Sequence, residues 1–120
     1  IDDAIIELLV GIVHDPAHGM LLTLGAGGIL TEIVSDTASL LLPSNEDEVL
    51  ECFNQLKVSK IAKGYRGFSG VDVNQIVDAI MKIQEFVLDN RDKVFEIEIN
   101  PLIVTNSEVI VADALIRKVT

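Results

Sequence analysis

The sequence is poor in cysteine and in aromatic residues. Cys52 is the only cysteine, which excludes an internal disulfide and a cysteine-based metal cluster. There is no Trp, one Tyr and four Phe, so a packed core has to be built mainly from Ile, Leu and Val. Hydrophobic residues still make up 49% of the chain. That proportion, over 120 residues, predicts one globular domain with a modest core rather than a disordered chain.

Basic residues are scarce as well. The chain has 9 Lys and Arg against 19 Asp and Glu, and a net charge of −10. Such an acidic chain has no electrostatic attraction to nucleic acid or to an anionic membrane surface. We therefore expect neither as a partner. An anionic nucleotide would have to be held by local donors, by a metal ion or by another part of the protein.

Long hydrophobic runs are missing too. No apolar run approaches the length of a membrane span, and no charged-then-apolar signal pattern is present. We therefore expect a cytoplasmic location. The sequence starts at Ile1, without Met, and enters a strand-like run directly. We interpret residues 1–120 as a single domain that is a fragment of a longer protein.

Apolar and polar residues alternate along Phe95 to Thr105, which predicts a strand with one buried face. The buried face would carry Phe95, Ile97 and Ile99. Asn106–Ser107 supplies a turn, and Glu108 to Asp113 has the composition of a returning strand. Pro101 has no N–H to give to the ladder, so it indicates an edge strand or a bulge at that point.

A two-residue loop at Asn106–Ser107 would place Asn100 opposite Asp113. Opposed side chains share a face, with Cβ atoms roughly 4.5–5.5 Å apart, so Glu98, Asn100 and Asp113 would meet at the open end of the hairpin. Two carboxylates and an amide oxygen are donors that Mg²⁺ accepts, usually together with substrate phosphates. A longer loop would shift the register and separate the set. The alternative is that these polar residues simply face water.

The first part of the chain predicts further strands. Ala4 to Val13 has the composition of a buried strand, although its length also fits a helix, and Met20 to Leu24 would pair with it. Gly25 to Gly28 permits close backbone approach. Without a Walker lysine or a full GxGxxG pattern, a tight turn between strands is favoured there over a phosphate cradle. Ile29 to Val34 and Ala38 to Leu42 are expected to be strands.

Two amphipathic helices are expected in the middle of the chain. Ser44 would cap the first, with acidic residues in its first turn, and Lys57 to Lys63 would follow as an irregular segment. Asp72 would cap the second, which ends near Asn90, with Gln75 at the capping-box position. The expected core-facing residues are Val49, Cys52, Phe53, Leu56, Ile76, Val77, Ile80, Ile83, Val87 and Leu88. The fold prediction is α+β: a mostly antiparallel sheet with the two helices on one face.

Two histidines flank an Asp-Pro turn near the N-terminus. His14 and His18 are metal-ligand types, but two loop histidines four residues apart have no fixed geometry. No metal site is assigned to them.

Glu98-Ile-Asn100-Pro101-Leu, followed by a hairpin and Asp113, resembles the metal-binding end of ATP-grasp ligases. More narrowly, the chain is similar to the ADP-forming acyl-CoA (acetyl-CoA) synthetases and to the related succinyl-CoA ligase β chain. The resemblance extends over most of the chain through motifs of similar order and spacing. These are Val10-Gly11, Asp15-Pro16, Gly19, Gly25-x-Gly27-Gly28, Glu32, Asp36, Pro43 and Gly64-Tyr65-Arg66-Gly67.

The resemblance implies the C-terminal part of the ATP-grasp domain of a ligase. Such a ligase interconverts acyl-CoA, ADP and phosphate with a carboxylic acid, CoA and ATP. Mg²⁺ and ATP or ADP would be the cofactors, with Glu98, Asn100 and Asp113 as the metal ligands. Weaker nucleotide or phosphate contacts would come from Gly27, Gly28, Glu32 and Arg66.

The same resemblance implies partner domains that lie outside residues 1–120. CoA would bind elsewhere in the parent protein. The N-terminal half of the ATP-grasp domain and the CoA-binding domains would lie on the same chain or on another subunit. Residues 1–120 alone would therefore be inactive. The phosphohistidine through which the related enzymes relay phosphate corresponds to neither His14 nor His18.

Two positions depart from the family pattern. A basic residue usually follows the metal-site Asp by two, where this chain has Leu115, and another precedes a Leu-x-Pro, where it has Leu40. Arg117 is a candidate replacement. These departures support a second interpretation, in which the chain is a non-catalytic regulatory or interaction module with a degenerate ATP-grasp fold.

Overall fold

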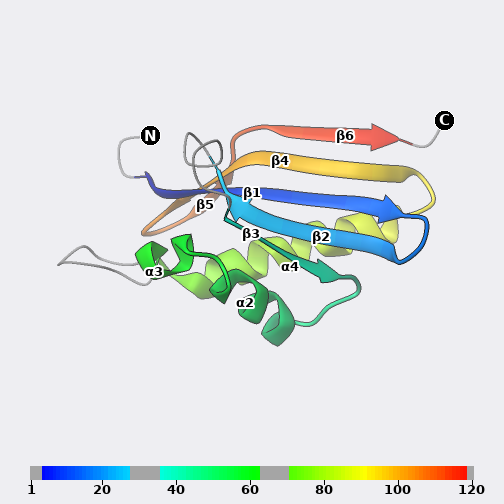
Figure 1. Cartoon of the computed structure of the whole chain (residues 1–120). Coiled ribbons are helices and arrows are strands. Elements are labelled where there is room, and N and C mark those ends of the chain that lie inside the picture. The colour runs from blue at the N-terminus through cyan, green and yellow to red at the C-terminus, as the bar shows by residue number, and fades with distance from the viewer. Residues whose placement is uncertain (1–3, 28–35, 63–70, 119–120) are drawn as a thin grey trace.

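The computed structural model shows an antiparallel sheet with helices along one face (Figure 1). It describes residues 4–27, 36–62 and 71–118. The strands are β1 (Ala4–Asp15), β2 (Gly19–Ala26), β3 (Thr37–Leu41), β4 (Val94–Thr105), β5 (Val109–Val111) and β6 (Ala114–Lys118). The helices are α2 (Glu46–Asn54), α3 (Val58–Ala62) and α4 (Val73–Asp89). The α+β prediction, with helices on one face of an antiparallel sheet, is confirmed.

The sheet runs in the order β3-β2-β1-β4-β5, and β6 also pairs with β4. β1 and β2 form the expected hairpin, so the helical alternative for the first segment is wrong. β3 extends the sheet beyond β2, with Leu40 opposite Leu22. The strand expected at Ile29 to Val34 lies outside the described residues. No described helix is long and apolar enough to cross a membrane.

β4 lies inside the sheet, between β1 on one side and β5 and β6 on the other. Its pairing with β1 shifts where Leu8 faces Leu102 but Val10 faces Ile99. The bulge on β4 therefore falls at Asn100 and Pro101. Of the two alternatives for Pro101, the bulge is confirmed and the edge strand is not, because β4 pairs on both sides. On β4, Ile97 and Ile99 are buried before the bulge, and Leu102 and Val104 are buried after it. The buried positions therefore change from odd to even numbers at the bulge.

Phe95 does not lie on the buried face as predicted. Its side chain is 41% exposed, whereas Val94 is 5% exposed. The pairing of β4 with β6 slips between Val94 and Glu96, so Val94 occupies the buried place. The Phe95 ring instead meets the His14 ring edge to face, with centroids 6.5 Å apart.

The first long helix is capped one residue later than predicted. Asn45, not Ser44, is the N-cap of α2, and it exchanges hydrogen bonds with Glu48 in a capping box. Ser44 is buried, and its backbone N–H and hydroxyl both donate to Gln84 Oε1 on α4, at 3.1 and 2.6 Å. Gln84 Nε2 donates to the Ser44 carbonyl oxygen at 2.9 Å. This buried pair ties the start of α2 to α4.

The segment expected to be irregular after α2 contains the short helix α3. The carboxylate of Asp36 holds its beginning, because Oδ1 accepts from Lys57 N at 2.7 Å and Oδ2 from Val58 N at 3.0 Å. α4 begins and ends as predicted, at Asp72 and Asn90. The Asp72 side chain accepts from Asn74 N, and the reciprocal capping-box bond from Gln75 is not formed.

The core lies between the helix-covered face of the sheet and α2, α3 and α4. It is built from aliphatic residues, as the composition predicted, with Phe53 as its fully buried aromatic residue among those described. Members contributed by the two long helices are Val49, Cys52, Phe53, Ile76, Val77, Ile80 and Val87. The opposite face of the sheet, which we call the open face, is not covered by any described helix (Figure 1).

Candidate metal and nucleotide site

The hairpin register that was predicted from the turn residues is confirmed. Val104 pairs with Val109, Ile103 with Ile110 and Leu102 with Val111. At the turn, Thr105 N donates to the Glu108 carbonyl oxygen at 2.9 Å. The Thr105 hydroxyl accepts from the backbone N–H groups of Ser107 and Glu108 at 3.2 and 3.0 Å. These bonds close the two-residue loop and thereby fix which residues meet further along.

The same register continues past β5 to the proposed ligands. Asn100 N donates to the Asp113 carbonyl oxygen at 3.1 Å, and Leu115 pairs with Glu98. Ile97 and Ile99 are 6% and 3% exposed against the helices. Because successive side chains on a strand alternate between faces, Glu98 and Asn100 lie on the open face. Asp113, opposite Asn100, shares that face.

The electrostatics of this row favour a cation. Glu98 is half-buried and Asn100 and Asp113 are exposed, and none of the three side chains makes an ion pair or hydrogen bond within the described part of the chain. Arg117 on β6, which pairs with Glu96 on β4, is the next basic residue along β6 from Asp113. Its Nε lies 3.1 Å from Glu96 Oε1, so Arg117 is already paired. Two carboxylates therefore lie on this face without an ion-pair partner among the described residues.

The donor set fits Mg²⁺ better than a softer metal. Carboxylate and amide oxygens are hard ligands, and Mg²⁺ commonly takes one or two carboxylates and completes its shell with water and phosphate oxygens. Among the described residues no group of three or more His, Cys, Asp or Glu is arranged to hold a metal. The set of Glu98, Asn100 and Asp113 contains two such residues and an amide. Further oxygens would have to come from a bound phosphate, so metal binding here stays a prediction.

The two departures from the family pattern fall in different places. Leu115 lies directly beside the candidate site, opposite Glu98, and is 51% exposed. Leu40 pairs with Leu22 and packs against the core, so it lies on the helix-covered face. Of the two departures, only Leu115 therefore lies on the face that carries the candidate metal ligands. Arg117, the candidate replacement, is engaged by Glu96.

Gly27 lies close against the backbone of β1. Its N–H donates to the Glu7 carbonyl oxygen at 2.8 Å, and a Cβ at this position would lie 3.3 Å from Glu7 backbone atoms. A Cβ on Gly25 would meet the Asp36 carbonyl oxygen and Thr37 Cγ2, both at 3.2 Å. The tight turn that was expected at Gly25 to Gly28 does not begin at Gly25, because Gly25 and Ala26 lie in β2 and pair with Leu9 and Leu8. The other weak nucleotide contacts, Gly28, Glu32 and Arg66, lie outside the described residues.

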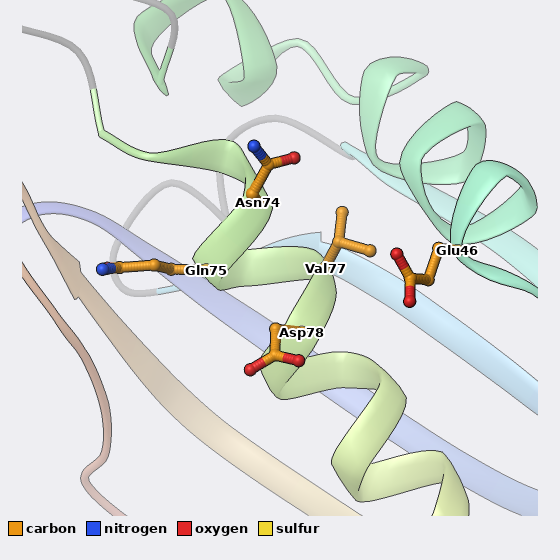
Figure 2. A pocket seen from close by; sticks show the side chains of 5 residues that line it. All are labelled: Glu46, Asn74, Gln75, Val77 and Asp78. Carbon is orange, nitrogen blue, oxygen red and sulfur yellow. The ribbon is translucent and has the colours of Figure 1, made fainter.

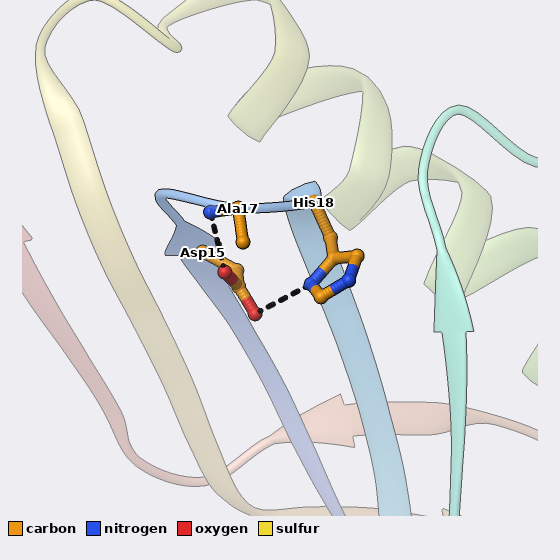
Figure 3. A network of polar contacts seen from close by, with 3 residues as sticks. All are labelled: Asp15, Ala17 and His18. Carbon is orange, nitrogen blue, oxygen red and sulfur yellow. Dashed lines mark hydrogen bonds and ion pairs between the residues drawn. The ribbon is translucent and has the colours of Figure 1, made fainter.

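The histidines do not converge on one site. His14 packs against Phe95, whereas His18 Nδ1 lies 3.3 Å from Asp15 Oδ2 (Figure 3). The backbone N–H of Ala17 donates to Asp15 Oδ1 at 2.8 Å. That hydrogen bond, followed by the contact with His18, holds the pKa of the Asp15 carboxyl below its ordinary value. The network stabilises the turn between β1 and β2.

A hollow that the sequence did not indicate lies in the helix layer (Figure 2). Its volume is about 350 Å³, and its lining residues are Glu46, Asn74, Gln75, Val77 and Asp78. Glu46 reaches from α2 toward Val77 on α4, while Asp78 is paired with Lys82 at 3.3 Å. This hollow is on the other side of the sheet from Glu98 and is not part of the candidate metal site.

Comparison with protein families gives a match over nearly the whole chain. A family model described as an ATP-grasp domain matches residues 2–117. The β subunit of acetate–CoA ligase [ADP-forming] II from Pyrococcus furiosus is 32% identical over 98 residues, which are 82% of this chain and 42% of that subunit. Acetate–CoA ligase [ADP-forming] II from Archaeoglobus fulgidus is 33% identical over 111 residues, 92% of this chain and 16% of the relative.

Solved structures give the same result. Dinucleotide-forming acetyl-coenzyme A synthetase 1 from Ca. Korarchaeum cryptofilum, in complex with coenzyme A and Mg-AMPPCP, superimposes with a TM-score of 0.86 at 28% identity. The match covers 94% of this chain and 53% of that one. This chain thus spans about half the length, or less, of the proteins that it matches. The resemblance drawn from the sequence motifs is confirmed.

Proposed function

Because the chain belongs to the ATP-grasp domain family, we propose that it is the nucleotide- and Mg²⁺-binding part of an ADP-forming acyl-CoA ligase. The reaction converts acyl-CoA, ADP and phosphate into a carboxylic acid, CoA and ATP, and runs in either direction. The observation that carries the proposal is the β4–β6 register, which supports one shared face for Glu98, Asn100 and Asp113.

The roles of the three residues follow from their chemistry. Phosphoryl transfer depends mainly on positioning and on neutralising phosphate charge. A Mg²⁺ held by these residues would supply that charge neutralisation. Glu98 and Asp113 would hold the ion by charge, while the neutral Asn100 oxygen adds a donor without further repulsion toward phosphate. Glu98 and Asn100 lie on β4, which places them more rigidly than a loop would, whereas Asp113 lies between β5 and β6.

The rest of the reaction needs parts outside this chain. We propose that an N-terminal ATP-grasp half and CoA-binding domains, on the same polypeptide or on another subunit, complete the enzyme in the cytoplasm. Residues 1–120 alone would bind metal weakly and catalyse nothing. The relatives reported above are ligases, so the alternative of a non-catalytic module is not favoured.

The test uses the whole polypeptide, or pair of subunits, that carries these residues. It is incubated with ADP, phosphate, Mg²⁺ and a panel of short acyl-CoAs, and ATP is measured. We expect ATP formation that Asn100→Ala and Asp113→Ala abolish. Ser107→Ala, an exposed change at the far end of the same hairpin, should leave it unchanged. A folded protein that forms no ATP from any thioester would refute the ligase and favour a binding module.

A further inference from the structure

Gly11 lies in the middle of β1, which pairs with β2 on one side and with β4 on the other (Figure 1). A glycine inside a strand weakens the strand, and it commonly marks a bulge, a bend or a close approach by a backbone or a ligand. The other described glycines have such a reason. Gly19 has a φ of 94°, and a Cβ on Gly25 or Gly27 would lie 3.2 or 3.3 Å from neighbouring atoms.

None of these structural reasons applies to Gly11. Its φ is not left-handed, and a Cβ built on it would meet no described atom within 4 Å. Its pairs with Thr23 and Glu98 belong to regular stretches of both ladders. Val10 and Ile12, on either side of it, are buried against the helices, so the missing side chain leaves a gap on the open face.

This gap, which we call the β1 notch, is bounded on four sides. Along β1 it is flanked by the half-buried residues Leu9 and Val13. Across the sheet Glu98 bounds it on one side and Thr23 on the other. The Thr23 hydroxyl lies 3.1 Å from the Ser39 hydroxyl. The backbones of the two strands that bound the notch are two strand spacings apart, about 9.6 Å.

We propose that the phosphates of a nucleoside diphosphate bound through Mg²⁺ lie in the β1 notch, so that Gly11 is a specificity-determining position. The inference rests on the proposed function, because Glu98 is one of the candidate metal ligands. On one side Glu98 has Leu115 as its neighbour, and this apolar side chain offers phosphate no hydrogen bond. On the other side lies the notch, with the Thr23 hydroxyl as a donor at its far boundary.

The charge of Glu98 favours this occupant over a side chain from the rest of the parent protein. An apolar side chain would find contacts with Leu9 and Val13. It would also cover the Glu98 carboxylate, which has no ion-pair partner among the described residues, and burying an unpaired charge is costly. A phosphate bound through a metal ion brings the missing positive charge with it. The notch should therefore matter for nucleotide binding only when Mg²⁺ is present.

The primary measurement is the dissociation constant of ADP for the whole polypeptide, or pair of subunits, that carries these residues. Calorimetry measures it with and without Mg²⁺. We expect Gly11→Leu to weaken Mg²⁺-dependent binding by at least about tenfold and Gly11→Ala to weaken it less, while binding without Mg²⁺ stays unchanged. Leu41→Phe, which adds bulk at an exposed position on the edge strand β3, is the matched control and should change affinity by less than about twofold.

The melting temperature of the same variants separates a ligand site from a structural glycine. Because a Cβ on Gly11 meets no described atom, Gly11→Ala should leave the melting temperature unchanged or raise it while it weakens ADP binding. A glycine that served only the fold would show a lower melting temperature and an unchanged affinity. Combining Gly11→Leu with Asp113→Asn should weaken binding by less than the product of the two separate losses, because both remove the same Mg²⁺-dependent contact.

Failure of this inference can be told apart from failure of the proposed function. A protein that binds ADP with Mg²⁺ and forms ATP, but whose affinity Gly11→Leu leaves intact, would overturn the role of the notch and keep the ligase. Equal weakening with and without Mg²⁺, together with a lower melting temperature, would assign the notch to a side chain of the parent protein and overturn the inference too. A folded protein that binds no ADP in the presence of Mg²⁺ would refute both.

Discussion

Asn100 and Asp113 are joined backbone to backbone, with Asn100 N donating to the Asp113 carbonyl oxygen at 3.1 Å. This bond continues a register that the Thr105–Glu108 turn fixes at the other end of the hairpin. Two residues that are 13 positions apart in sequence are therefore held side by side by the main chain. Their side chains are free to bind a ligand without breaking the structure that positions them.

The first prediction concerns the charge of Asp113. Asp113→Asn keeps an oxygen but removes the charge, so Mg²⁺-dependent ADP binding by the whole ligase should weaken by about tenfold or more. Calorimetry with and without Mg²⁺ measures the change, and binding without Mg²⁺ should be unaffected. Glu108→Gln removes a carboxylate at the other end of the hairpin and is the control. Equal losses in the two variants would contradict a specific role for Asp113.

The second prediction concerns the buried pair that joins α2 to α4. Gln84 is 5% exposed and makes three hydrogen bonds with Ser44. Gln84→Leu should lower the free energy of unfolding by about 2–3 kcal/mol, because buried donors on Ser44 lose their acceptor. Urea denaturation measures this. Glu85→Gln, an exposed neighbour on the same helix, should change it by less than about 0.5 kcal/mol. If Gln84→Leu behaves like the control, the pair is not a stabilising contact.

The third prediction compares the effect of an alanine substitution at two glycines on stability. A Cβ on Gly27 would lie 3.3 Å from the backbone of Glu7, whereas a Cβ on Gly11 would meet nothing within 4 Å. Gly27→Ala should destabilise the fold by about 1–3 kcal/mol, because backbone on a paired strand cannot move aside cheaply. Gly11→Ala should be neutral or stabilising by up to about 1 kcal/mol through reduced chain entropy. Thermal unfolding of both variants measures the difference, and similar melting temperatures would argue against the close approach.

The hairpin could be predicted because local signals determine it. Asn106–Ser107 sets the loop length, the loop length sets the register, and the register brings Asn100 to Asp113. The cap of α2 was also present in the sequence, since Asn45 and Glu48 form a capping box; the neighbouring Ser44 offered an equally good cap type. Whether the site binds metal is a different question, because its remaining ligands would come from outside the chain.

Long-range contacts account for what the sequence did not reveal. α3 has no cap of its own and begins on the carboxylate of Asp36, which is 21 residues earlier than Lys57. The exposure of Phe95 follows from a register slip between β4 and β6, which no local pattern encodes. Leu40 differs from the family pattern, but only the sheet pairing shows that it faces the core rather than the candidate site.

The last prediction follows from the depressed pKa of Asp15, which results first from the Ala17 N–H and then from His18. A carboxyl whose pKa is lower in the folded state stabilises the fold above its unfolded-state pKa, and this stabilisation is lost as pH falls through the folded-state value. Asp15→Asn should therefore lower the melting temperature at pH 7, and the difference from the unaltered chain should vanish in strong acid, well below the ordinary value of 3.8. Thermal unfolding over this pH range measures the effect. Asp92→Asn, an exposed change in another turn, is the control. A difference that persists unchanged into strong acid would show that the carboxylate charge is not its cause.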